Sequence, residues 1–81
     1  MKITLKFFAS LREACGRKED TFEVPEGITV GELQKLTVEK YPELGELMDS
    51  TMPVVNMEYV EEDRVLKDHD DVTFIPPVSG G

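Results

Sequence analysis

Polar and apolar side chains alternate from the start of the chain. Over residues 2–7 the apolar positions fall on one side, and Phe8 falls on the other. Alternation with a period of two is typical of a strand that buries one face. A second alternating stretch spans residues 21–24. The pattern predicts two strands that form a hairpin, and the side chains expected in a core are Ile3, Leu5, Phe7, Phe22 and Val24.

The connection between these two strands predicts a short helix. Its first residues, Ser-Leu-Arg-Glu, match a capping box in which Ser10 and Glu13 hold the first turn. Gly16 fits the residue that follows a helix, because glycine adopts the left-handed conformation without strain. We expect one or two helical turns between the strands.

A longer helix is predicted over about residues 29–40. Its first turn carries a second capping box, formed by Thr29 and Glu32. Pro42 disfavours helical geometry at the residue before it, so the helix ends near Tyr41. The apolar residues expected to pack this helix on a core are Val30, Leu33 and Leu36, together with Tyr41.

The second half of the chain predicts two short strands, 53–56 and 59–60, and a final strand over 71–75. The helix between the second and third strands is long enough to cross over one face of a mixed sheet. The predicted fold class is therefore α+β, a ubiquitin-like β-grasp in which a mixed sheet of four to five strands packs on one main helix. Its first and last strands lie side by side at the centre, with Val72 and Phe74 in the core.

Six residues of a different kind follow the final strand. Two prolines end the strand, because proline cannot donate to a sheet ladder. The two terminal glycines carry no side chain that would block a narrow channel. Fully extended, six residues reach roughly 20 Å. We predict a β-grasp domain over residues 1–75 and a flexible tail over residues 76–81, which are Pro76, Pro77, Val78, Ser79, Gly80 and Gly81.

Charge and composition narrow the class of protein. The net charge is −8, divided into +4 over residues 1–18 and −12 over residues 19–81. Such a chain repels nucleic acid phosphates. Its acidic side chains either attract a partner with a basic face or serve solubility alone. No apolar run approaches the roughly 20 residues of a membrane span, and the one cysteine excludes an internal disulfide. We expect a cytoplasmic protein with no nucleic acid or membrane partner.

Candidate chemistry outside the tail is sparse. Cys15 lies on a short apolar stripe and is interpreted as a small buried hydrophobe rather than a persulfide carrier. His69 has acidic neighbours, but consecutive turn residues do not converge on one ion, so no metal site is predicted. Phe8, Tyr59 and Ile75 each fall opposite an inward residue. They are expected to form an exposed apolar patch beside the tail, the alternative being partial burial under the short helix.

With these residues in view, the sequence resembles the sulfur-carrier β-grasp proteins of the MoaD/ThiS family over essentially its whole length. The most specific match is residues 66–81, with an Asp-x-Asp turn, a Val-x-Phe strand, Pro-Pro-Val and a terminal Gly-Gly. The match extends to residues 7–16 and to Val55-Asn56. His69 departs from the glycine usual in that turn, and a positive φ is expected there.

The resemblance implies a carrier rather than an enzyme. An adenylyltransferase related to ubiquitin-activating enzymes would use ATP to adenylate the Gly81 carboxylate, and a persulfide sulfur donor protein would convert it to a thiocarboxylate. The large subunit of molybdopterin synthase would then transfer the sulfur to a pterin precursor. Catalytic side chains would belong to these partners, and no cofactor would be bound permanently. The residues implied in partner contact are Phe8, Arg12, Tyr59 and Ile75, with Pro76, Pro77, Val78, Ser79 and Gly80 presenting Gly81.

Two other functions use the same activated carboxylate. One is a sulfur carrier for thiamine or cysteine synthesis, and the other is a ubiquitin-like modifier joined to lysines through Gly81. Pro-Pro-Val favours the molybdopterin pathway, because the thiamine carriers generally lack the paired prolines. A free-standing enzyme is not expected, since the sequence offers no nucleophile with a matching base.

Overall fold

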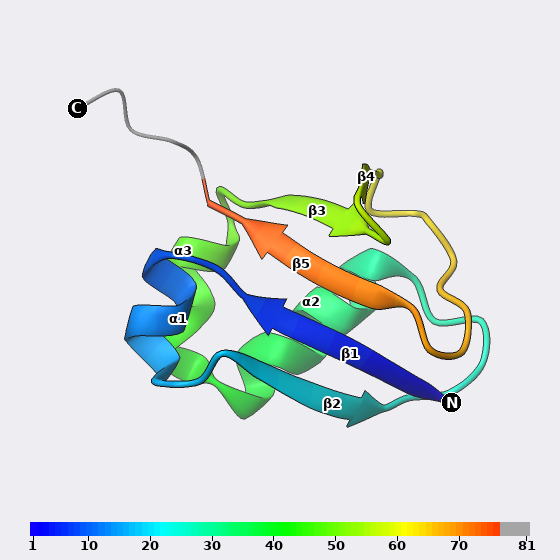
Figure 1. Cartoon of the computed structure of the whole chain (residues 1–81), viewed down its shortest axis with the longest axis horizontal. Helices are drawn as coiled ribbons and strands as arrows, with labels where there is room; N and C mark the ends of the chain where they lie inside the picture. Colours follow the sequence, from blue (N-terminus) through cyan, green and yellow to red (C-terminus); the bar gives the residue numbers. More distant parts are fainter. Residues whose placement is uncertain (77–81) are drawn as a thin grey trace.

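The computed structural model describes residues 1–76 (Figure 1). Within that range the chain forms one mixed sheet, and its helices lie in the connections between consecutive strands. The elements, in order, are β1 (Lys2–Phe7), α1 (Ser10–Cys15), β2 (Glu19–Glu23), α2 (Val30–Lys40), the 3-10 turn η1 (Pro42–Leu44), α3 (Gly45–Met48), β3 (Met52–Val55), β4 (Glu58–Tyr59) and β5 (Asp71–Ile75).

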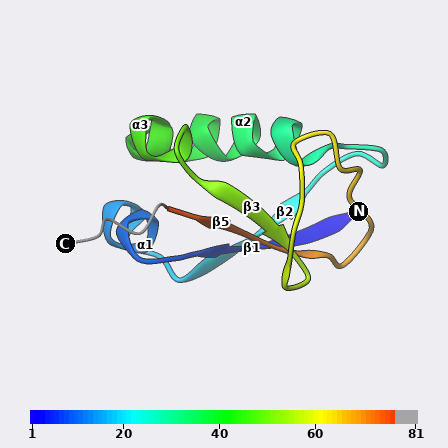
Figure 2. The same ribbon diagram turned by 90° about the horizontal axis from the view of Figure 1, so that it is seen from above.

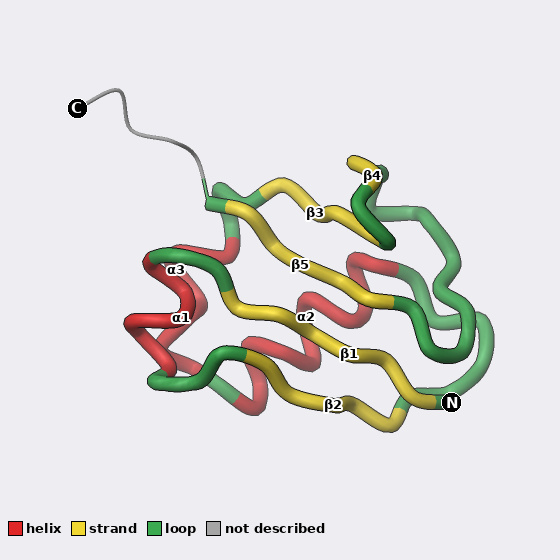
Figure 3. Tube along the Cα trace, viewed as in Figure 1, coloured by secondary structure: helices red, strands yellow, loops and turns green. Residues whose placement is uncertain are grey.

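The five strands lie in the order β2-β1-β5-β3-β4 (Figure 3). β1 runs parallel to β5, and the other neighbouring strands are antiparallel. The first and last strands are therefore adjacent at the centre, as the β-grasp topology predicts. As a consequence, the chain leaves the sheet from its middle rather than from an edge.

Helix α2 crosses one face of the sheet, and α3 continues along the same side (Figure 2). The predicted capping box at its start is confirmed. The Thr29 hydroxyl accepts from the Glu32 backbone N–H at 3.2 Å, and the Glu32 carboxylate accepts from the Thr29 N–H at 3.1 Å. These bonds satisfy two of the backbone donors that every helix start leaves unpaired. The helix ends at Lys40, as expected from Pro42.

The predicted core is confirmed in every member except Leu36, which is only partly buried. The next residue, Thr37, is fully buried instead. Its hydroxyl donates to the Leu33 carbonyl at 2.8 Å and so has a hydrogen-bond partner without water. The apolar space at the end of α2 is closed by two residues that the sequence pattern did not assign to the core, Leu44 in η1 and Met48 in α3. The core is therefore built by the short helical segments as well as by α2.

The capping box predicted at the start of α1 is wrong. Ser10 is already helical, the N-cap is Ala9 with φ 49°, and no side chain caps this helix. The chain must turn sharply out of β1 directly after Phe8, and this turn, rather than the Ser10 hydroxyl, sets where the helix begins. The predicted helix end is confirmed, because Gly16 is left-handed at φ 72° and its N–H donates to the Arg12 carbonyl at 2.9 Å.

Candidate functional site

The face of the sheet opposite α2 exposes apolar side chains where β5 ends. Phe8 follows Phe7, which lies in register with Phe74, so the next step places Phe8 level with Ile75. On the other side of Ile75 lies Met52, its register partner in β3. Phe8 is 54% and Met52 57% exposed, while Ile75 is half-buried. The strands β5 and β3 and the residue that follows β1 thus contribute to one apolar surface.

Tyr59 extends this surface to the edge of the sheet. It is 66% exposed and pairs with Val54, which in turn pairs with Thr73, two residues before Ile75 on the same face. We call the four side chains Phe8, Met52, Tyr59 and Ile75 the sheet patch. The structure therefore brings together the three residues that the sequence indicated, and leaves Phe8 and Tyr59 exposed rather than covered by α1.

Met52 is the member of the patch that sequence reasoning missed. The third strand was predicted to begin at Pro53, one residue late, so Met52 was assigned to no element. The register of β3 against β5 places Met52 beside Ile75. Methionine suits a surface that meets more than one partner, because its unbranched side chain adapts its shape.

Arg12 lies on α1 at the same end of the sheet and is exposed. The helix starts directly after the patch residue Phe8, whose carbonyl accepts from the Leu11 N–H at 3.1 Å. Pro76, which follows the patch residue Ile75, is half-buried. The remaining predicted site residues lie outside the described residues, and so does most of the predicted tail: Pro77, Val78, Ser79, Gly80 and Gly81.

The strongest electrostatic cluster lies away from the patch and is structural. Asp20 accepts from the Tyr41 hydroxyl at 2.6 Å and pairs with Lys40 at 2.7 Å. Burial acts to raise the pKa of Asp20, but the hydrogen bonds from Lys40 and Tyr41 outweigh it and hold the pKa below its ordinary value. Burial, followed by the bond to Asp20, raises the pKa of Tyr41 to about 12. This cluster ties β2 to the end of α2.

Cys15 and His69 show no arrangement for chemistry in the described part of the chain. Cys15 is half-buried, more exposed than predicted, and its thiol lies 3.7 Å from the Arg17 carbonyl. His69 has φ 67°, which confirms the expected positive φ, and its Nε2 lies 3.4 Å from Asp68. Residues 1–76 contain no group of three potential metal ligands. Over the same range, no helix is long and apolar enough to cross a membrane.

A five-stranded mixed sheet that grips one helix, with its last strand central, defines a ubiquitin-like β-grasp protein. Within that class, the chain belongs to the ThiS family, whose profile matches residues 5–81. The structure does not describe the last five residues, but the family profile matches their sequence, including the two terminal glycines.

Three similar proteins show how far the likeness reaches. A curated relative from Chlamydomonas reinhardtii, named molybdopterin synthase sulfur carrier subunit, is 37% identical, and the alignment spans the whole of both chains. The crystal structure of SAMP1 from Haloferax volcanii is 26% identical over the whole of both chains, with a TM-score of 0.90. A chain from the complex of subunits 1 and 2 of the Helicobacter pylori molybdopterin-converting factor covers both chains completely at a TM-score of 0.74 and 21% identity, and shows the fold alone.

Proposed function

We propose that this chain is the sulfur carrier subunit of a molybdopterin synthase, and that Gly81 carries the sulfur. The observation that supports this most is the likeness to the algal sulfur carrier subunit, which spans both chains from end to end. The sequence ends in Gly80-Gly81 after a strand at the centre of the sheet. A terminal segment that starts at the sheet centre, beside the sheet patch, is well placed to be guided into a partner that covers that patch.

The proposed chemistry needs an activated terminus, because a carboxylate is a poor electrophile at neutral pH. The Gly81 carboxylate attacks the α-phosphate of ATP on an adenylyltransferase, and pyrophosphate leaves. A persulfide on a sulfur donor protein attacks the acyl carbon, and AMP leaves. A thiol then reduces the resulting acyl disulfide, which gives the thiocarboxylate and a disulfide. The large synthase subunit would move this sulfur to a pterin precursor. We place these steps in the cytoplasm, where thiols are kept reduced.

The sheet patch is the proposed docking surface for these partners. Exposed aromatic and methionine side chains are typical of the centres of protein interfaces, and a contiguous apolar surface on a small protein usually marks a binding site. Arg12 would add a charged contact beside Phe8, at the edge of the patch. The carrier itself would supply no catalytic side chain, so its partners would each bind the same patch in turn.

The test of the carrier function is deletion of Gly81. The truncated chain should retain its melting temperature, because the core lies within residues 1–76. It should fail to support ATP–pyrophosphate exchange by the adenylyltransferase, while binding to that enzyme weakens far less, because the sheet patch remains. Exchange at the wild-type rate from a chain that ends at Gly80 would contradict the proposal.

A modifier function is the second candidate, and a specific observation favours it. The likeness to SAMP1, which is also called small archaeal modifier protein 1, has a TM-score of 0.90. Intact-mass analysis of the protein isolated from cells separates the two functions. A carrier shows replacement of one oxygen by sulfur at its terminus, whereas a modifier is recovered in isopeptide linkage to lysines of other proteins.

A further inference from the structure

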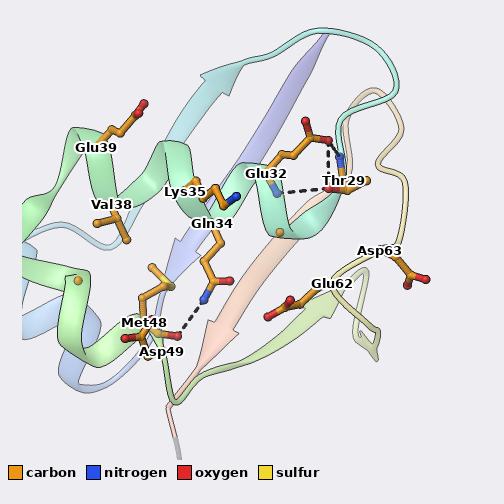
Figure 4. A pocket seen from close by; sticks show the side chains of 12 residues that line it. Thr29, Glu32, Gln34, Lys35, Val38, Glu39, Met48, Asp49, Glu62 and Asp63 are labelled. Carbon is orange, nitrogen blue, oxygen red and sulfur yellow. Dashed lines mark hydrogen bonds between the residues drawn. The ribbon is translucent and has the colours of Figure 1, made fainter.

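A groove lies on the helical side of the molecule, away from the sheet patch (Figure 4). One wall is α2, the other is the loop that carries Glu62 and Asp63, and α3 closes one end. Its volume of about 810 Å³ is comparable to that of sites that hold ligands or several side chains. The sheet patch contributes no side chain to this groove.

The groove is open because the sheet is too narrow at this edge to cover the flank of α2. β4 has only two residues. A stripe of α2 with helical spacing, Gly31, Gln34, Lys35 and Val38, therefore faces the opening. The loop reaches the helix only at its first turn, where the Gly31 N–H donates to the Glu62 carbonyl at 2.9 Å. Farther along α2 no strand or loop among residues 1–76 closes the groove.

The charge of its lining makes the groove favour a positively charged partner. Its described lining carries five carboxylates against the single ammonium of Lys35. Val38 and Met48 supply an apolar floor between the charged rims. The complement is a protein segment with lysine or arginine side chains and at least one apolar side chain, because opposite charges on the rim orient a partner while the buried apolar contact holds it. A phosphate-rich ligand would be repelled.

The groove is continuous with the sheet patch around the edge of the sheet. A shallow hollow lined by Met52 and Tyr59 shares Glu62 and Asp63 with the groove. A partner that covers the patch therefore reaches the groove without a gap. The two surfaces can be bound by one protein at the same time.

The closed end of the groove lies near the point where the chain leaves the sheet. Met48 forms part of that end, and its carbonyl accepts from the Thr51 hydroxyl at 2.8 Å. The next residue, Met52, pairs with Ile75, which precedes Pro76. A protein that binds next to Pro76 is therefore close to one end of the groove.

We propose that a basic segment of the adenylating enzyme docks in this groove, while the same enzyme covers the sheet patch. This inference rests on the proposed function. Among the proposed partners the adenylating enzyme is favoured because it must hold two anions together, the ATP phosphates and the Gly81 carboxylate, and therefore needs cationic side chains around the entry to its site. Further cationic side chains on the same basic surface of the enzyme would pair with the acidic groove and orient the carrier.

The test measures ATP–pyrophosphate exchange as a function of carrier concentration. In the variant Glu62→Gln/Asp63→Asn the KM for the carrier should rise about tenfold with kcat unchanged, because rim charges act on association and not on the chemical step. The matched control is Glu23→Gln/Glu26→Gln, which removes the same charge from exposed residues outside the groove. Its KM should stay within about twofold of the wild type, since salt screens the interaction between the enzyme and carrier charges that lie far from the contact. The difference between the two double variants should shrink as salt is raised.

A steric variant tests the groove without changing charge. Gly45 is helical at φ −52°, and a Cβ there would lie at an ordinary contact distance of 3.7 Å from Val38. Gly45→Leu should therefore fold at least as stably as the wild type, since leucine is the better helix former. Its side chain should occupy the groove floor, and the KM for the carrier should rise while kcat is retained.

The outcomes separate this inference from the proposed function. If wild-type carrier supports no exchange, the proposed function fails. If wild-type exchange is normal and both double variants have equal KM values, the groove inference fails and the proposed function stands. The inference is also overturned if Gly45→Leu, folded by its melting curve, has the wild-type KM. Loss of self-association in Glu62→Gln/Asp63→Asn, seen by sedimentation, would identify a second copy of the chain as the occupant and would likewise overturn it.

Discussion

Leu33 is the core residue of α2 at which one substitution tests the predicted buried face of the helix. It has no accessible surface and lies in the apolar cluster that α2 shares with the sheet. Leu33→Ala should lower the free energy of unfolding by roughly 2–5 kcal/mol, because the lost side chain leaves a cavity that a small core closes only in part. Chemical denaturation measures this directly, with exposed Lys35→Ala on the same helix as the control. A free energy of unfolding that hardly changes in Leu33→Ala would show that the buried face of α2 is wrongly assigned.

Asp20 makes stability depend on pH. Its pKa is lower in the folded protein than the ordinary value of 3.8, so the stabilisation is complete above that pH and is lost as the pH falls through the folded pKa. Asp20→Asn should lower the free energy of unfolding by about 1–3 kcal/mol at pH 7, because Lys40 loses its ion-pair partner and the Tyr41 hydroxyl loses a charged acceptor. Denaturation curves at pH 7 and below pH 3.8 should show the gap between variant and wild type narrowing in acid. A gap that is constant with pH would contradict the assignment.

Tyr41 makes stability depend on pH in the opposite direction, with the loss occurring as the pH rises. Because its pKa is raised to about 12 from 10.0, the neutral form contributes stability below pH 10, and this contribution is lost as the pH rises from 10 towards 12. Tyr41→Phe should therefore be less stable than wild type at pH 8 by about 0.5–1.5 kcal/mol, the worth of one hydrogen bond. Denaturation at pH 8 and at pH 11 should show that difference decreasing in base.

The β3–β4 hairpin is an element held in a conformation that its residues do not favour. Its two-residue loop, Asn56-Met57, has φ 49° and 71°, which is a type I′ turn. Asparagine followed by glycine is the preferred pair there, and Met57 is 95% exposed, so it gains no packing in return. Met57→Gly should raise the free energy of unfolding by about 0.5–1 kcal/mol, since removal of the strained Cβ outweighs the added freedom of the unfolded chain.

The control for this turn is Glu58→Gly, one residue later. Glu58 is in β4 and is not among the residues with positive φ, so glycine there should destabilise the protein by about 0.5–1 kcal/mol. Thermal melts of the two variants should shift in opposite directions. Equal shifts would show that the turn is not of the I′ type.

At the scale of the whole molecule, the net charge of −8 comes from seventeen acidic against nine basic side chains. The groove carries five of the acidic side chains, whereas the sheet patch is apolar. Association with the adenylating enzyme should therefore slow as salt rises, because charges separated by more than a Debye length of about 10 Å at 0.1 M are screened. Stopped-flow measurement of the on-rate tests this. A rate independent of salt would leave the charge with a role in solubility alone.

The sequence by itself determined the elements and the class of protein. Each predicted strand and the main helix depends on local rules that hold within a few residues, such as alternation over residues 2–7 and the capping box at Thr29. The terminal segment 66–81 indicated the family, because the chemistry of a carrier lies in a contiguous stretch that needs no folding to be read.

Only the tertiary structure decided which side chains share a surface. Met52 lies beside Ile75 because β3 runs antiparallel to β5 in one particular register, and a shift of one residue would turn it to the other face. The start of α1 at Ser10 followed from the turn out of β1 rather than from the local capping pattern. The groove exists because β4 is too short to cover α2, and it brings residues 29–49 together with Glu62 and Asp63 from the loop after β4. Local propensity acts over one or two turns, whereas these contacts depend on where whole strands pair, and that is fixed only when the core closes.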